Sequence, residues 1–177
     1  MGRPKALLHD VDGTSWVQHA VEVLVDGGCT GVTVVLGASA DQAVRLLDGL
    51  GVDVVLAHDW AQGMSASLRA GLASLHGSDA DAAVVSLVDT PDLTAAVVRR
   101  VLAESEGDEA LALARASYHG RPGHPVVLGR AHWAAVAAGA TGDAGARDYL
   151  ARRETVLVEC GDLATGQDVD QPTSAVG

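Results

Sequence analysis

The stretch GVTVVLGASADQAVRLLDGLGVDVVLAH, residues 31–58, decides the fold class. It begins with the short, β-branched apolar run Gly31–Gly37, continues with the helical pattern QAVRLLDGL, and ends with a second apolar run, Val52–His58. Apolar runs of this length without polar alternation are typical of strands buried on both faces. We therefore interpret residues 31–58 as two strands of one sheet with a helix between them.

The same alternation of strand-like and helix-like segments continues along the chain. Further apolar runs predict strands at Ala82–Val88, Ala110–Ala116, His124–Gly129 and Thr155–Cys160. Capping boxes at Ser15–Gln18 and Ser39–Gln42 predict where two of the helices begin. We expect a single α/β domain over residues 1–177, with a mostly parallel open sheet and helices on both faces.

Length and composition narrow the class of protein. The chain has 177 residues, of which 48% are hydrophobic, which suits one packed domain. No apolar run approaches the roughly 18 residues of a membrane helix, and the N-terminus lacks the apolar core of a signal peptide. A formal net charge of −11 argues against general nucleic-acid binding, which requires a basic face. We therefore expect a cytoplasmic protein that binds neither membrane nor nucleic acid.

Cysteine and histidine spacing does not indicate a zinc site or a disulfide framework. Cys29 and Cys160 lie far apart in the chain and form no C-x-x-C motif. The seven histidines are scattered, with no pair at the helical spacing of metal ligands. A zinc hydrolase is therefore not expected.

The opening residues, MGRPKALLHDVDGTSW, allow two interpretations that both concern phosphate chemistry. Met1–Lys5 resembles the second half of a phosphate-binding loop, and Lys5 is the only lysine in the chain. The stretch DVDGT resembles the nucleophile loop of haloacid dehalogenase-type phosphatases, with Asp10 as nucleophile and Asp12 as acid and base. The chain lacks the downstream lysine and the late acidic motif of those phosphatases, and Asp12–Gly13 is equally typical of a tight turn.

Collinear segments of the chain resemble the molybdenum cofactor nucleotidyltransferases, most closely their cytidylyltransferase branch. The segments are MGRPKALL (1–8), WAQGMSASLRAGL (60–72), VDTPDLT (88–94), YHGRPGHPVVLGR (118–130), GDAGARDYL (142–150) and DVDQP (168–172). The resemblance implies a nucleotide-diphospho-sugar transferase fold, which is Rossmann-like. It also implies Mg²⁺-dependent transfer of CMP from CTP to a molybdopterin-type cofactor, with release of pyrophosphate. Transfer of GMP, or another phosphorylated acceptor, is the alternative within this class.

The matching N-terminal residues suit nucleotidyl transfer, in which several negative groups gather at one phosphorus atom. Lys5 and Arg3 can neutralise the triphosphate, and Gly2 lets the backbone approach it closely. The acceptor phosphate is already anionic near neutral pH, so no strong general base is required. We therefore expect catalysis to depend on positioning and charge neutralisation, with Lys5, Arg3 and Asp89 as the catalytic residues.

Asp89 is the first candidate ligand for Mg²⁺, because its carboxylate is a hard oxygen donor. It follows the predicted strand Ala82–Val88, and open α/β sheets bind ligands beyond the carboxyl ends of their strands. A turn residue beside Pro91 is its structural alternative. Asp170, with Asp168 as the alternative, is expected to complete the metal site, unless both belong to a solvated tail.

Two further groups of residues are expected to hold the substrates. The nucleotide group lies at a predicted helix N-terminus and consists of Gly63, Ser65 and Ser67. The acceptor group lies in a Gly- and Pro-containing loop and consists of Arg121, Gly123 and His124. The structural alternatives are helix capping for the first group and a hairpin-like turn for the second.

The resemblance breaks at the N-terminus, since the first strand of the family and its Gly-rich loop are missing from the sequence. That strand lies in the middle of the family's sheet, so its absence should leave an unpaired slot with exposed backbone groups. Met1 takes the place of an internal methionine of the family, and we expect a longer native chain. A non-catalytic accessory protein that binds a molybdoenzyme or its chaperone is the alternative outside catalysis.

Overall fold

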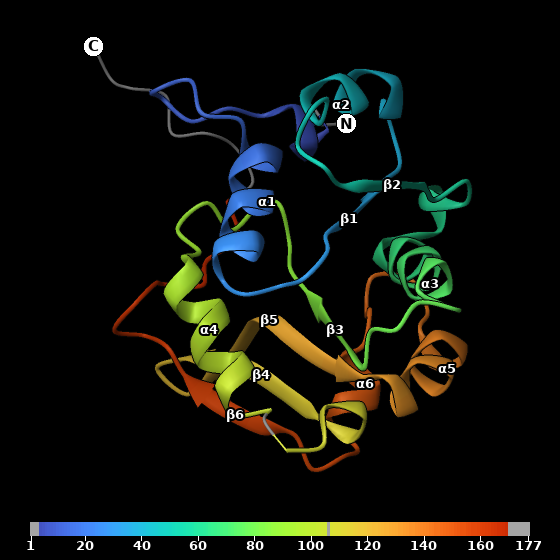
Figure 1. Ribbon diagram of the computed structural model, residues 1–177, viewed down its shortest axis with the longest axis vertical. Helices are drawn as coiled ribbons and strands as arrows, with labels where there is room; N and C mark the ends of the chain where they lie inside the picture. The colour runs from blue at the N-terminus through green and yellow to red at the C-terminus, as the bar shows by residue number, and fades with distance from the viewer. Residues whose placement is uncertain (1–3, 106, 170–177) are drawn as a thin grey trace.

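Helices and strands alternate along residues 4–105 and 107–169, which the computed structural model describes (Figure 1). The strands are β1 (Thr33–Leu36), β2 (Asp53–Leu56), β3 (Ala82–Val85), β4 (Leu113–Tyr118), β5 (Arg121–Gly129) and β6 (Val156–Glu159). The α-helices are α1 (Trp16–Asp26), α2 (Ala40–Leu46), α3 (Met64–Ser74), α4 (Ala95–Ala103), α5 (Arg130–Gly139) and α6 (Arg147–Leu150). Short 3-10 helices are η1 (Lys5–Leu7), η2 (Trp60–Gln62) and η3 (Glu109–Leu111). In the described part of the chain, no helix has the length and apolar character needed to cross a membrane.

The segment 31–58 folds as the strand–helix–strand unit that its pattern predicts. β1 and β2 pair in parallel, with Val34 opposite Val54, and α2 connects them. A core cluster beside this sheet joins α1 to α2 and the end of β1, with members that include Val17, Val21, Leu36, Ala43 and Leu47. The unit is therefore anchored through the helices that flank it.

The remaining strands form a second sheet in the order β3-β5-β4-β6. β4 and β6 are parallel, whereas β5 is antiparallel to both β3 and β4. The two residues His119 and Gly120 connect β4 to β5, and so short a connection joins only antiparallel strands. Their φ angles of 52° and 77° suit a primed hairpin turn. The α/β class with mostly parallel strands is thus confirmed, and β5 runs against the direction that β3, β4 and β6 share.

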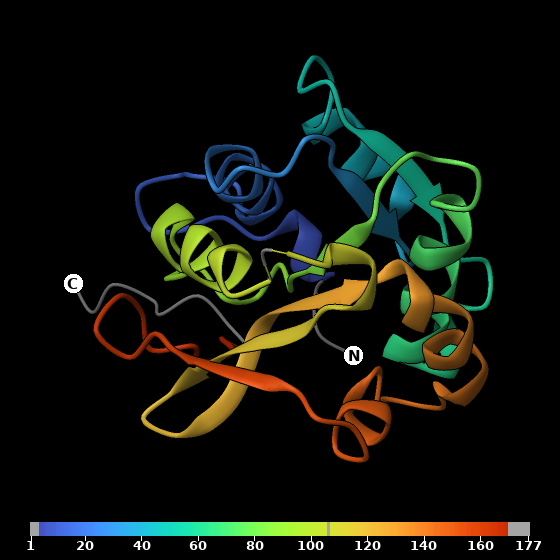
Figure 2. The same ribbon diagram turned by 60° about the horizontal axis from the view of Figure 1, so that its bottom comes forward.

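Helices cover both faces of the second sheet (Figure 2). Successive side chains of β5 point to opposite faces, so Val127 packs in a cluster with Val97 and Val101 of α4. Leu128 packs in a different cluster with Trp133 of α5. This two-sided burial explains why the strands read as continuous apolar runs.

Neither predicted capping box forms. The side chain of Ser15 makes no capping hydrogen bond, and the Gln18 amide instead donates to the carbonyl of Leu46 over 2.8 Å. Ser39 adopts a left-handed backbone conformation with φ 59° and likewise makes no side-chain capping bond. Helices α1 and α2 begin where the capping boxes predict. The side-chain hydrogen bonds of a capping box are, however, not what stabilises these helix starts.

The two sheets are not joined edge to edge. Among the described residues, β1 pairs only with β2, and β3 pairs on one side with β5. Residues Thr33–Val35 of β1 and Ala82–Val85 of β3 line the same cavity, whose volume is about 1270 Å³. The sheet of the molecule is therefore interrupted between β1 and β3.

Candidate active site

Lys5 and Asp89 form an ion pair although 84 residues separate them in the chain. Asp89 lies in the turn beyond β3 and is buried, with 9% of its surface exposed. Nζ of Lys5, the first residue of η1, donates to Oδ2 of Asp89. The structure thus brings together two of the predicted catalytic residues at the carboxyl end of a strand.

The turn that carries Asp89 also holds the segment that follows β6. The backbone N–H of Val169 donates to the Asp89 carbonyl over 2.8 Å. The N–H and hydroxyl of Thr165 both donate to Oδ2 of Asp92, over 2.6 and 2.5 Å. Asp168 is therefore held at this turn through its neighbour Val169. The start of η1, the turn after β3 and residues 165–169 therefore lie beside one another.

Asp89 and Asp168 are the members of the predicted metal group that lie within the described residues. In residues 4–105 and 107–169, no three His, Cys, Asp or Glu side chains could form a metal site by themselves. One or two carboxylates are nevertheless enough for Mg²⁺, because substrate phosphates and water commonly fill the rest of its octahedral shell. The donor set thus fits a metal that arrives with a nucleotide. Asp170 lies outside the described residues, as do Gly2 and Arg3.

The N-terminus of α3 is built against the loop that precedes α6. Gly63 has φ 103°, and a Cβ there would lie 2.5 Å from Oδ1 of Asp143, so glycine is required on both counts. The Met64 N–H donates to the same Oδ1 over 3.2 Å, which places a carboxylate at the positive end of the helix. Ser65 is fully buried, and its hydroxyl accepts from the Gly145 N–H over 3.1 Å. Ser65 thus supports the loop, and its expected contact with nucleotide stays a prediction.

Ser67 and His124 are far apart in the sequence, but both line the cavity of about 1270 Å³. Ser67 is one turn into α3 and half-buried, whereas His124 lies in β5. Met64 and Gly145 line the cavity as well. One residue of the predicted nucleotide group and one of the predicted acceptor group therefore line the same cavity.

His124 is a half-buried imidazole between charges of opposite sign. Burial lowers its pKa to about 4, with a further decrease from Arg115 and an opposing increase from Asp89. His124 is therefore neutral near pH 7 and able to donate or accept one hydrogen bond at the acceptor loop. Arg115 donates from Nε and Nη2 to the Gly123 carbonyl, over 3.3 and 3.0 Å. Burial, and then the charge of Arg147, lowers the pKa of Arg115, whose own guanidinium acts on His124.

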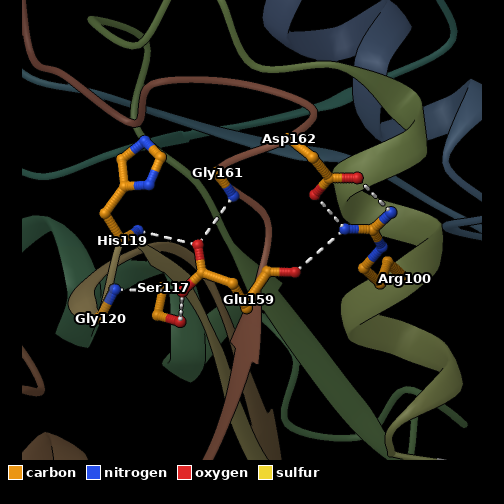
Figure 3. A network of polar contacts seen from close by, with 7 residues as sticks. All are labelled: Arg100, Ser117, His119, Gly120, Glu159, Gly161 and Asp162. Carbon is orange, nitrogen blue, oxygen red and sulfur yellow. Dashed lines mark hydrogen bonds and ion pairs between the residues drawn. The ribbon is translucent and has the colours of Figure 1, made fainter.

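A carboxylate fastens the turn of the acceptor hairpin (Figure 3). Oε1 of Glu159 accepts from the N–H groups of His119 and Gly161, over 2.8 and 2.9 Å. Its Oε2 accepts from the Gly120 N–H and the Ser117 hydroxyl, over 3.1 and 2.9 Å. The Gly120 bond contributes most to lowering the pKa of Glu159 to about 2, and the other three bonds add to it. Arg121 is exposed directly after this turn, three residues before His124, or about 10 Å along an extended strand.

Asp10 and Asp12 belong to a turn, as the structural alternative predicts. The Gly13 N–H donates to the Asp10 carbonyl over 3.0 Å, and the Thr14 N–H donates to Oδ1 of Asp12 over 3.0 Å. The Asp10 carboxylate accepts from Nε1 of the buried Trp16 over 2.7 Å. This segment therefore orients the start of α1.

Sequence reasoning missed three polar residues that shape the site. Arg115 is the one charged residue in the apolar stretch ALALARA, and that isolation was the available signal. Asp143 and Glu159 gave no comparable signal, because each acts on backbone N–H groups that only the folded chain brings near.

The site pairs a lysine with a carboxylate beyond the end of β3, and Arg115 of β4 lies near His124, so it offers the positive groups and the carboxylate that phosphoryl chemistry uses. The chain belongs to the MobA-like NTP transferase domain family, whose model matches residues 1–156. The protein is accordingly a nucleotidyltransferase of this family.

Individual relatives span most of the chain. A protein named nicotine blue oxidoreductase, from Paenarthrobacter nicotinovorans, is 37% identical over 96% of this chain and 85% of its own length. The manganese complex of Rv0371c from Mycobacterium tuberculosis H37Rv is 29% identical, with a TM-score of 0.71 over 90% of this chain and 82% of that one. Molybdopterin-guanine dinucleotide biosynthesis protein A from Archaeoglobus fulgidus shares the fold, with a TM-score of 0.64 and 14% identity over 97% of this chain and 86% of that one.

Proposed function

We propose that the protein is a cytoplasmic, Mg²⁺-dependent cytidylyltransferase that transfers CMP from CTP to the phosphate of a molybdopterin-type cofactor. The Lys5–Asp89 pair carries this proposal, because it joins the chain's only lysine to a buried carboxylate at a strand end. Membership of the MobA-like family supports the transferase class. The manganese bound to Rv0371c supports a divalent metal.

In the proposed reaction, an oxygen of the acceptor phosphate attacks the α-phosphorus of CTP. A new P–O bond forms, the bond from that phosphorus to the bridging oxygen of the β-phosphate breaks, and pyrophosphate leaves. Lys5 and Arg3 neutralise the triphosphate, while the backbone at Gly2 contacts it. Asp89, with Asp168 or Asp170, would hold the metal, which supplies further neutralisation of the phosphates.

The two substrates are proposed to meet at the end of the large cavity. Ser67 and the backbone at Gly63 contact the nucleotide from the start of α3. Arg121, Gly123 and His124 receive the acceptor, and the neutral His124 positions it by a hydrogen bond. The positive charge of Arg115 near His124 favours an acceptor that carries a phosphate.

Thermal unfolding with Mg²⁺ and each of CTP, GTP, ATP and UTP tests the nucleotide. At a hundred times the dissociation constant, a bound ligand stabilises by about 2.7 kcal/mol. For a chain of this size we expect CTP to raise Tm by about 5–10 °C, and K5A and D89N to lose that shift. A shift with GTP alone would replace CMP by GMP in the proposal. D10N is the control, and stabilisation by beryllium fluoride alone would favour the phosphatase.

A second candidate function is oxidoreduction, favoured by the 37% identity to the protein named nicotine blue oxidoreductase. The same unfolding assay, repeated with nicotinamide and flavin cofactors, separates it from nucleotidyl transfer. We expect no shift with either cofactor. A shift with one of them and none with any nucleoside triphosphate would favour the oxidoreductase. Nucleotide binding without turnover on any phosphorylated acceptor would favour an accessory protein that binds a molybdoenzyme or its chaperone.

A further inference from the structure

Tyr118, the last residue of β4, touches two parts of the molecule that the proposed reaction uses. The first is the acceptor loop, residues 121–124. Tyr118 is buried, with 5% of its surface exposed, and its hydroxyl donates to the carbonyl of His124 over 2.6 Å. Burial raises the pKa of this hydroxyl, so the group stays protonated and remains a donor. The backbone of Gly123 also lies against the ring, because a Cβ at that position would be 2.7 Å from Cε2 of Tyr118.

The second part is the segment 165–169, which follows β6 in the chain. A Cβ at Gly166 would overlap Cδ2 and Cε2 of Tyr118, at the same edge of the ring that Gly123 approaches. Gly166 also has φ 65°, so glycine is required there on both counts. Gly166 lies two residues before Asp168, one of the proposed metal ligands. One aromatic ring therefore packs against the acceptor loop and against the segment that carries Asp168.

Both ends of segment 165–169 are fastened to the turn after β3. The N–H and the hydroxyl of Thr165 donate to Oδ2 of Asp92. The N–H of Val169 donates to the carbonyl of Asp89. Gly166 lies between these two anchors, against the Tyr118 ring, with no room for even a methyl group. Because close-packed contacts of this kind transmit displacements, a shift of Thr165 should reach the acceptor loop through Tyr118.

We propose that Tyr118 is a positioning residue that couples segment 165–169 to the acceptor loop. The functional meaning of this coupling rests on the proposed transferase, in which Asp168 is a candidate metal ligand and His124 receives the acceptor. The coupling fixes the loop in the shape that binds the acceptor, at a set position relative to the carboxylates. Its loss should therefore weaken acceptor binding and leave nucleotide binding nearly unchanged.

Amide exchange of the ligand-free chain, followed by NMR, tests the coupling without any substrate. Y118F removes the hydroxyl and keeps the ring. It should speed exchange at Gly123 and His124 by about five- to tenfold, which corresponds to the loss of one hydrogen bond. T165V should also speed exchange at the loop, although the hydroxyl that it removes is bonded to Asp92. In the double variant, T165V should add nothing at the loop to the effect of Y118F, because the path between the two sites is already broken.

Two matched controls use the same substitutions elsewhere in the chain. Y149F removes the hydroxyl of the chain's other tyrosine, which lies 2.8 Å from Nδ1 of His132. T155V removes a hydroxyl that donates to the carbonyl of Leu150 over 3.2 Å. His132 and Leu150 belong to α5 and α6, so neither control should change exchange at the acceptor loop.

Transfer kinetics separate positioning from a general loss of structure. Y118F should raise the KM for the acceptor about fivefold or more, with kcat and the KM for CTP nearly unchanged. An equal rise in both KM values would overturn the proposal. Unchanged loop exchange in Y118F, or effects of Y118F and T165V that simply add, would overturn it as well. Because the exchange measurements need neither nucleotide nor acceptor, their failure is distinguishable from a failure of the proposed transferase activity.

Discussion

The sheet β3-β5-β4-β6 and the sheet β1-β2 are built from similar apolar runs, yet they bury them differently. Val127 and Leu128 of β5 are 0% exposed, whereas Val54 and Leu56 of β2 are 38% and 47% exposed. The difference arises because α4 and α5 cover opposite faces of the sheet β3-β5-β4-β6. An apolar run thus predicts a strand, and its burial is decided by the helices that pack against it.

Replacing one leucine by alanine in each sheet should give the largest difference in stability between the two sheets. We expect L128A to lower the free energy of unfolding by about 2–5 kcal/mol, because a fully buried side chain leaves a cavity. We expect L56A to lower it by less than about 0.5 kcal/mol, because that side chain is largely exposed. Urea unfolding measures both values. Equal losses would contradict the contrast between the sheets.

His124 in the larger sheet makes stability depend on pH. The pKa of His124 is depressed to about 4, so between pH 6.5 and 4 the unfolded state binds more protons and stability falls as pH falls. The full loss is on the order of 3 kcal/mol. H124Q should flatten this part of the pH–stability curve. Parallel curves for H124Q and the wild type would disprove the lowered pKa of His124.

Much of the fold was predictable from short-range pattern, and the exceptions have physical causes. Apolar runs located all six strands of the described chain, both where the strand is buried, as in β5, and where it is largely exposed, as in β2. The direction of β5 was not predictable from its run, since direction depends on the two-residue turn at His119–Gly120. The capping boxes failed because Gln18 finds a partner, Leu46, 28 residues away.

The candidate site was likewise predictable only in part. The choice of Lys5 and Asp89 as site residues followed from motif resemblance and from the strand-end rule, whereas their ion pair is a finding of the structure. Burial of Ser65 was not predictable, because the loop at Gly145 that covers it lies 80 residues further along. The approach of Arg115 to Gly123 depends in turn on the β4–β5 hairpin. Contacts of this kind appear only once the chain has folded.

Two glycine-to-alanine variants test the packing at the start of α3, the helix that contacts both sheets. G63A should cost about 1–3 kcal/mol of unfolding free energy, because φ is 103° and Asp143 occupies the space. G139A is the control, since nothing lies within 4 Å of its Cβ position and α5 favours alanine. Thermal unfolding of both variants measures the difference. A neutral G63A would mean that the loop at Asp143 gives way.

The smallest expected effect is on the hairpin turn of the larger sheet. E159Q keeps the shape of the side chain and removes the charge that four donors share. The amides of His119, Gly120 and Gly161 should exchange about tenfold faster, with little change in Tm. E154Q, at an exposed glutamate ahead of β6, is the control. Unchanged exchange in E159Q would show that the carboxylate does not hold the turn.

The most direct test of the central claim is transfer of labelled CMP from CTP to a molybdopterin-type acceptor with Mg²⁺, using wild type, K5A, K5R, D89N and D10N. Our account predicts that K5A and D89N each lower kcat/KM by about 10²–10³-fold, since each removes a group that neutralises the reacting phosphates. K5R should retain part of the activity, and D10N nearly all of it. Full turnover by K5A and D89N, or loss of turnover in D10N alone, would contradict a site built on the Lys5–Asp89 pair.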